Sequence, residues 1–155
     1  MSHLDSLVAC AGRFAGTSRL QDPHAGSPDE SPSTVTVTSV LGGRFVRLDY
    51  TWAYRGAPQE GSILFGFDAG AGEATAHWID TWHMSDKVMA CRGAVSTDGR
   101  FSLRGSYAAP PGPDWGWMID VAPEGKKVLR IVMHNVTPEG LAELAVEAEY
   151  ARAGS

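Results

Sequence analysis

Cysteine is scarce in this 155-residue sequence, which contains only Cys10 and Cys91. One possible pair is too few for the disulfide framework that holds small secreted domains together. A chain of this length does not need such cross-links, because it can bury a sizeable apolar core by itself. The sequence therefore predicts a single domain over residues 1–155 and a reducing, cytoplasmic environment.

Long apolar runs and clusters of positive charge are also missing. No run approaches the ~20 apolar residues that a helix needs to cross a bilayer. The stretch LVAC at residues 7–10 matches the pattern that precedes a bacterial lipid-attachment cysteine, but the preceding MSHLDS has no basic residue and no apolar segment, so we expect no lipid anchor. The net charge is −5, and no Lys/Arg run is available to follow a phosphate backbone. We expect neither a membrane nor a nucleic acid as partner.

Short alternating segments separated by glycine-rich turns fill most of the chain. The clearest is FVRLDYTWAY, in which one parity is apolar or aromatic and the other is polar, the pattern of a half-buried strand. It follows STVTVTSV across a turn at Gly42 and Gly43, so a hairpin is predicted here. The residues of its apolar parity are Val46, Leu48, Tyr50 and Trp52.

Further strands are predicted in SILFGFD, ATAHWIDTWHM, KVMACRGAV, RFSLRGSY, WGWMIDV and KVLRIVMHNV. Residues 5–11 predict a short helix capped by Asp5 or Ser6, and the Pro- and Ser-rich residues 18–33 predict an exposed connection. The final LAELAVEAEYAR favours helix by propensity and strand by parity. We interpret it as a strand, because a closing strand removes an exposed sheet edge. The prediction is an all-β, antiparallel, up-and-down barrel of about ten strands with a short N-terminal helix.

Four short motifs resemble those of a bacterial family of uncharacterised lipocalin-like proteins, a domain of unknown function. They are Gly12-Arg13-Phe14, LGGRF at residues 41–45, the arm at residues 61–68 ending in Gly-Phe-Asp, and Trp78-Ile79-Asp80. Their order and spacing span most of the chain. Phe14 stands where the wider lipocalin-like group usually has tryptophan. The resemblance implies a calycin-type barrel with a helix near one end and an internal cavity, and it implies no reaction and no catalytic residues.

The stretch HWIDTWHM, residues 77–84, places two tryptophans, two histidines and an aspartate in one predicted strand. Strand parity places Trp78, Asp80 and Trp82 on one face, and His77 and His83 on the other. Two histidines six positions apart lie roughly 20 Å apart along a strand, so they cannot share a metal ion. The indole face is either plain core or a cavity wall in which Asp80 orients a polar group of a ligand.

We therefore predict that the barrel interior binds a small, largely apolar molecule, without metal or cofactor. The predicted contacts are Tyr50, Trp52, Trp78, Asp80, Trp82 and Trp117. The rival interpretation is an isomerase or hydrolase that uses Asp80 with a cross-strand histidine as an acid/base pair. His134 could meet His77 or His83 across the barrel. Haem held through one histidine and a homodimeric interaction module remain as further alternatives. Residues 18–33 and 107–114 are the candidate lids over the barrel mouth.

Overall fold

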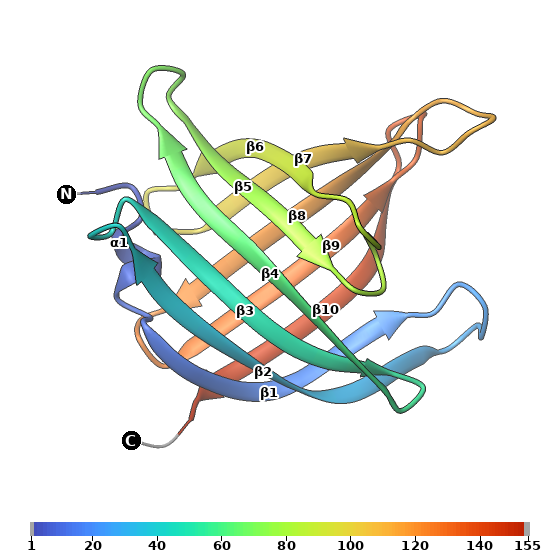
Figure 1. The fold of residues 1–155 in the computed structure, drawn as a ribbon, viewed down its shortest axis with the longest axis horizontal. Helices are drawn as coiled ribbons and strands as arrows, with labels where there is room; N and C mark the ends of the chain where they lie inside the picture. Colours follow the sequence, from blue (N-terminus) through green and yellow to red (C-terminus); the bar gives the residue numbers. More distant parts are fainter. Residues whose placement is uncertain (1, 154–155) are drawn as a thin grey trace.

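The computed structural model describes residues 2–153 as a closed barrel of antiparallel strands with one short helix (Figure 1). The elements are α1 (Asp5–Val8), β1 (Gly12–Gln21), β2 (Pro28–Val40), β3 (Phe45–Tyr54), β4 (Ala57–Asp68), β5 (Glu73–Asp80), β6 (Met89–Val95), β7 (Phe101–Tyr107), β8 (Trp115–Glu124), β9 (Val128–Val136) and β10 (Ala142–Arg152). The predicted all-β, up-and-down barrel is therefore confirmed.

Every strand pairs with its neighbours in the sequence, and β10 pairs with β1 to close the sheet. The segment of ambiguous propensity is thus a strand, with Tyr150 opposite Gly16 and Ala148 opposite Ser18. The β2–β3 turn also forms where it was predicted. Gly42 and Gly43 adopt φ values of 66° and 87° there, a conformation that glycine accepts without strain.

Alternation between inside and outside determines the core. On β3 the side chains of Val46 and Leu48 are fully buried, while the intervening Arg47 is exposed. The same alternation recurs on the other strands and fills the interior with large side chains such as Trp78, Phe65 and Phe101. Aliphatic and aromatic groups thus pack the barrel along much of its length, and an open cavity lies at one end.

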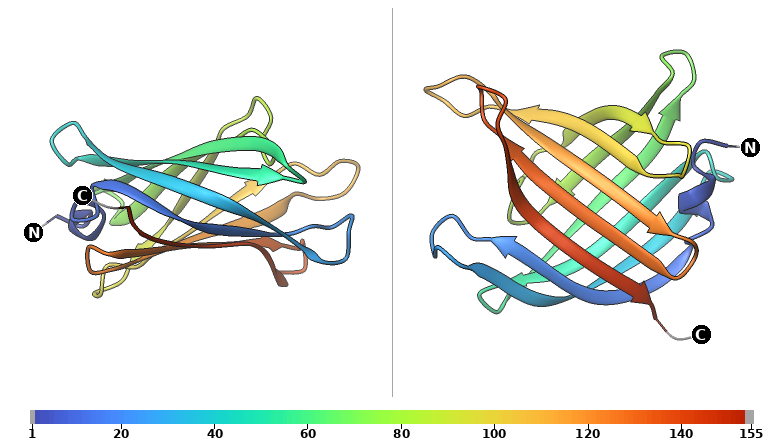
Figure 2. Two further views of the ribbon diagram at one scale, coloured as in Figure 1. Left: turned by 90° about the horizontal axis from the view of Figure 1, so that it is seen from below. Right: turned by 180° about the vertical axis from the view of Figure 1, so that it is seen from behind.

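Helix α1 lies at the opposite end of the barrel (Figures 1 and 2). Leu4, Leu7 and Cys10 are buried there. The Ser6 hydroxyl donates to the Gly99 carbonyl at 2.9 Å, which attaches the helix to the β6–β7 turn. The helix is shorter than predicted, and its N-cap is Leu4, which provides no side-chain cap. No helix in the described part of the chain is long and apolar enough to span a membrane.

The prediction of an exposed connection at residues 18–33 is wrong for most of these residues, which belong to strands. Strand β1 continues to Gln21 and β2 begins at Pro28, which leaves only residues 22–27 as a loop. Within residues 18–33 three buried strand positions hold small hydroxyl residues and Leu20 is the one buried apolar side chain, so the segment lacks the apolar alternation that marks a strand. The inward hydroxyl residues are Ser18, Ser31 and Ser33.

The strand predicted through HWIDTWHM is also shorter than expected. Strand β5 ends at Asp80, and residues 81–86 form a turn. Trp82 is half-buried in that turn, and its ring packs against the core. The prediction that His83 lies on the outer face is wrong, because the chain bends back over the barrel after Asp80 and directs this side chain inward.

Candidate functional site

The carboxylate of Asp80 organises the inner end of the open cavity. Its Oδ2 accepts hydrogen bonds from the Tyr50 hydroxyl at 2.6 Å and from the Trp52 indole N–H at 3.3 Å. Its Oδ1 accepts the backbone N–H groups of Trp82 at 2.8 Å and of His83 at 2.9 Å. Four donors occupy the four lone-pair positions of a carboxylate, and an ionised carboxylate is an acceptor only. Asp80 therefore holds β3 and the 81–86 turn together.

Tyr50 connects this carboxylate to the indole wall. Its hydroxyl accepts the Trp78 N–H at 2.8 Å while donating to Asp80. Burial, followed by the charge of Asp80, holds the pKa of Tyr50 well above its usual value. Gly61 on β4 leaves the space for this ring, because a Cβ atom there would overlap the tyrosine hydroxyl. The network is thus built from three neighbouring strands, β3, β4 and β5.

The His83 imidazole lies among four indole rings. Its centroid is 4.7 Å from that of Trp82, 5.3 Å from Trp117, 5.5 Å from Trp78 and 5.6 Å from Trp52. Burial among these rings lowers the pKa of His83 below its usual value of 6.5, although the charge of Asp80 opposes this effect. Burial therefore favours the neutral imidazole, which has one ring nitrogen as donor and the other as acceptor.

An open cavity of about 740 Å³ lies at the end of the barrel opposite α1. This volume falls within the range that accommodates small organic ligands, about 300–1,000 Å³. A second void of about 20 Å³ lies deeper, bordered by Tyr50 and Asp80, and has room for about one water molecule. Leu20 and His83 line both spaces. The open cavity is lined by Leu20, Gln21, Pro23, Trp78, Trp82, His83, Met84, Ser85, Lys87, Val88, Met89, Ser106, Tyr107, Ala108, Trp117, Asn135, Glu143, Leu144 and Ala145.

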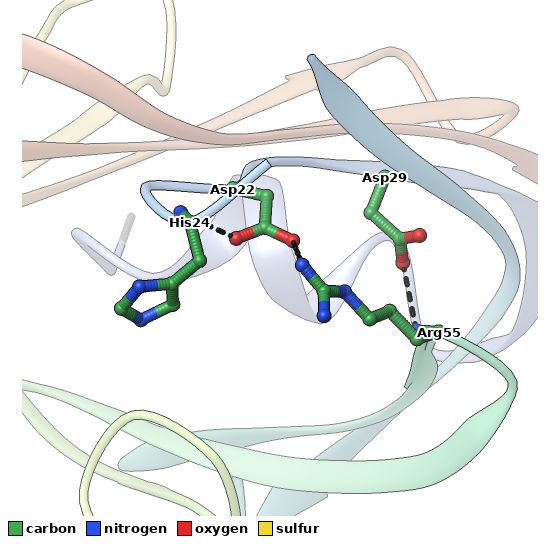
Figure 3. Close-up of polar contacts among 4 residues, drawn as sticks. All are labelled: Asp22, His24, Asp29 and Arg55. Carbon is green, nitrogen blue, oxygen red and sulfur yellow. Dashed lines mark hydrogen bonds and ion pairs between the residues drawn. The ribbon is translucent and has the colours of Figure 1, made fainter. Parts of the chain in front are cut away.

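An ion pair links two loops at the same end of the barrel (Figure 3). Asp22 Oδ2 accepts the Arg55 guanidinium at 3.2 Å, and its Oδ1 accepts the backbone N–H of His24 at 2.8 Å. The hydrogen bond from His24 is the main cause of the lowered pKa of Asp22, and Arg55 adds to it. The Arg55 backbone N–H donates to Asp29 at 3.2 Å. These contacts join the β1–β2 loop, whose Pro23 lines the cavity, to the β3–β4 turn.

The structure brings the six predicted contact residues together in two layers. Trp78, Trp82 and Trp117 line the open cavity. Tyr50, Trp52 and Asp80 lie beneath them, beside the small void. Whether these residues contact a ligand stays a prediction. The residue that the sequence reasoning missed is His83, which lines both spaces. The available signal was Asp80, because aspartate side chains often accept backbone N–H groups two or three positions ahead and so begin turns.

The meeting of His134 with His77 or His83 across the barrel, which the sequence left open, does not occur. His134 lies opposite Met118 on the parity that faces outward, between the buried Met133 and its neighbour Asn135. His77 is exposed on the outer face of β5. Neither side chain therefore reaches Asp80 from the interior. Within residues 2–153, no group of three or more His, Cys, Asp or Glu side chains is arranged to hold a metal ion.

Comparisons with known proteins agree with this architecture. The family described as "Protein of unknown function (DUF1579)" matches residues 3–152, which confirms the expected resemblance to an uncharacterised family of barrel proteins. No curated protein matches the chain. The crystal structure of Rv2717c from M. tuberculosis is similar, with a TM-score of 0.63 and 14% sequence identity over 99% of each chain. At this identity the likeness shows the fold alone.

Proposed function

The chain belongs to the DUF1579 family, and we propose that it binds a small, largely apolar molecule in the open cavity of the barrel. The observation that carries this proposal is the cavity of about 740 Å³ with Trp78, Trp82 and Trp117 in its wall. Indole rings provide large, rigid apolar surfaces, and buried indoles lose little conformational freedom when a ligand packs on them.

The site favours binding over acid/base catalysis by Asp80. A general base needs a free lone pair within hydrogen-bond reach of the proton that it removes. The Asp80 oxygens already accept four donors from Tyr50, Trp52 and the 81–86 turn. In our proposal Asp80 supports the cavity floor, and the indoles provide the contact. We also propose a cytoplasmic location, which the free, buried thiols of Cys10 and Cys91 support.

Ala108 provides a way to block the cavity with little effect on the fold. It is exposed in the β7–β8 loop and lines the mouth. Ala108→Trp should fill the entrance. Ala94→Trp is the matched control, because Ala94 is exposed on β6 and faces away from the interior. Binding is followed by the fluorescence of N-phenyl-1-naphthylamine, a neutral apolar probe.

The proposal expects the wild type and Ala94→Trp to bind the probe with equal affinity, and Ala108→Trp to bind about tenfold more weakly or worse, a loss of about 1.4 kcal/mol or more. Equal affinity in all three proteins would place the probe outside the cavity and contradict the proposal. Native mass spectrometry and an absorption scan of freshly purified protein complete the test. A Soret band would instead favour the haem alternative, with His83 as the histidine available in the cavity.

A further inference from the structure

One polar group in the cavity wall has no partner. The Nε1–H of Trp117 is buried and makes no hydrogen bond within the described residues. The side chain lines the open cavity, and the whole residue is only 6% exposed. A buried N–H without an acceptor is unfavourable, and native proteins retain few of them. The indole N–H groups of two other buried tryptophans do have acceptors. Trp78 donates to the Tyr50 hydroxyl, and Trp52 donates to the Asp80 carboxylate.

The surroundings of this N–H disfavour an anionic acceptor. The Asp80 carboxylate lies directly behind the 81–86 turn and accepts the backbone N–H of His83. The His83 imidazole, whose ring centroid is 5.3 Å from that of Trp117, is buried in a way that favours its neutral form. The charged residues that line the open cavity are Lys87 and Glu143, which carry opposite signs and lie in the exposed outer part of the wall. Trp117 thus brings to this wall an N–H donor that neighbouring atoms cover, and the oppositely charged Lys87 and Glu143 provide no net positive charge to balance an anion.

Apolar side chains also line the cavity, alongside the exposed Lys87 and Glu143. Leu20, Met84 and Met89 line its sides. Val88 and Leu144 lie at the rim and are 62% and 38% exposed. Exposed apolar side chains around a cavity mouth are typical of sites that receive an apolar body. The lining thus combines one unpartnered donor with a large apolar surface that reaches the rim.

We propose that the ligand is a neutral molecule whose apolar body carries a hydrogen-bond acceptor, such as a carbonyl oxygen or a ring nitrogen, and that it enters acceptor first. This inference rests on the proposed function and specifies its ligand class. The Trp117 N–H donates to the acceptor. The His83 ring, which packs against Trp117, shifts aside and contacts the same end of the ligand. The apolar body lies between Met84 and Leu144.

A matched pair of probes separates this inference from general apolar binding. The compounds 2-acetylnaphthalene and 2-ethylnaphthalene have nearly the same size and shape, and only the first carries a carbonyl. Their affinities are measured by calorimetry for the wild type, for Trp117→Phe and for Trp115→Phe. Trp115 is the control, because it lies on the same strand and does not line the cavity. In parallel, the indole N–H resonances are followed in ¹H–¹⁵N spectra of the wild type.

The ketone should bind the wild type and Trp115→Phe about three- to tenfold more tightly than the hydrocarbon, the effect of one hydrogen bond. Trp117→Phe should lose this preference and keep its affinity for the hydrocarbon. The Trp117 N–H resonance should move downfield with the ketone alone. Equal binding of both probes, with no such shift, overturns the inference and leaves cavity binding in place. Binding of neither probe counts against the proposed function itself. The resonance shift is measured in the wild type, so it decides the question even if Trp117→Phe folds poorly.

Discussion

The hydroxyl of Tyr50 donates a 2.6 Å hydrogen bond to the carboxylate of Asp80, from a strand thirty positions earlier in the chain. The two side chains are buried and belong to β3 and β5, with β4 between them. Gly61 of β4 lies opposite Tyr50 in the β3–β4 pairing and opposite Asp80 in the β4–β5 pairing. The hydrogen bond therefore crosses over a glycine on the inner face of the sheet, and it connects the cavity floor to the barrel wall.

Removal of the Tyr50 hydroxyl should destabilise the fold strongly. Tyr50→Phe removes one donor to a buried carboxylate and leaves the Trp78 N–H without its acceptor. We expect a loss of about 2–4 kcal/mol in the free energy of unfolding, measured by urea denaturation. The control is Tyr107→Phe, which removes a hydrogen bond to the neutral Asn135 at a half-buried position. Its expected cost is about 0.5–1.5 kcal/mol. Equal costs for the two variants would mean that Asp80 does not depend on Tyr50.

A methyl group at position 61 should disturb the same network without changing any polar group. In Gly61→Ala the added Cβ would overlap the Tyr50 ring and hydroxyl. Overpacking of this kind costs about 1–3 kcal/mol. Gly70→Ala is the matched control, since a Cβ there makes only an ordinary contact of 3.5 Å with Asp68. Thermal denaturation compares the two. A Gly61→Ala variant as stable as the wild type would show that the tyrosine has room to move.

The burial of His83 predicts a pH dependence of stability with a defined sign. Its folded-state pKa is lowered below 6.5, mainly by desolvation, so the unfolded chain binds the proton more readily. Stability from this residue is then fully present above about pH 6.5 and declines as the pH falls towards the folded-state pKa. His83→Gln removes the titrating group. The difference in unfolding free energy between wild type and variant should shrink on acidification over this window.

NMR provides an independent readout for His83. The chemical shift of its imidazole protons should titrate with a midpoint below 6.5 in the folded protein. A midpoint above that value would mean that the attraction of Asp80 outweighs burial, and it would reverse the predicted direction of the stability change.

Strand parity predicted most of the barrel, because the inner and outer faces differ so clearly in polarity. On β3 the alternation from Val46 to Trp52 reports burial directly. On β10 the parity of Ala148 and Tyr150 identified a strand against its helical propensity. Propensity is a weak local preference of a few tenths of a kcal/mol per residue, and pairing with β1 and β9 overrides it.

Parity failed where the inward side chains are polar. Ser33 is 2% exposed, and its hydroxyl bonds to the Thr51 carbonyl at 2.6 Å and to the Tyr150 hydroxyl at 2.8 Å. The Ser31 hydroxyl accepts the Ala53 N–H at 3.1 Å. These partners come from β3 and β10, and no local pattern reveals them. The serine-rich segment therefore has the composition of a loop, although Ser31 and Ser33 are buried on a strand.

The inward direction of Trp78 and Asp80 was predicted correctly, and the position of His83 was not. The prediction extended the strand parity beyond Asp80, but the Asp80 carboxylate accepts hydrogen bonds from the backbone N–H groups of Trp82 and His83, and the strand ends there. Residues 81–86 form a turn, so strand parity no longer applies to them, and the adjacent side chains of Trp82 and His83 both line the cavity.

The pairing of β1 with β10 sets a condition on the order of folding. Phe14 finds its register partner in Arg152, nearly a full chain length away. During synthesis on the ribosome, the edge of β1 that pairs with β10 therefore remains unpaired until β10 has emerged. A chain truncated before β10 would carry two open edges, one on β1 and one on β9, and both are templates for pairing with other chains.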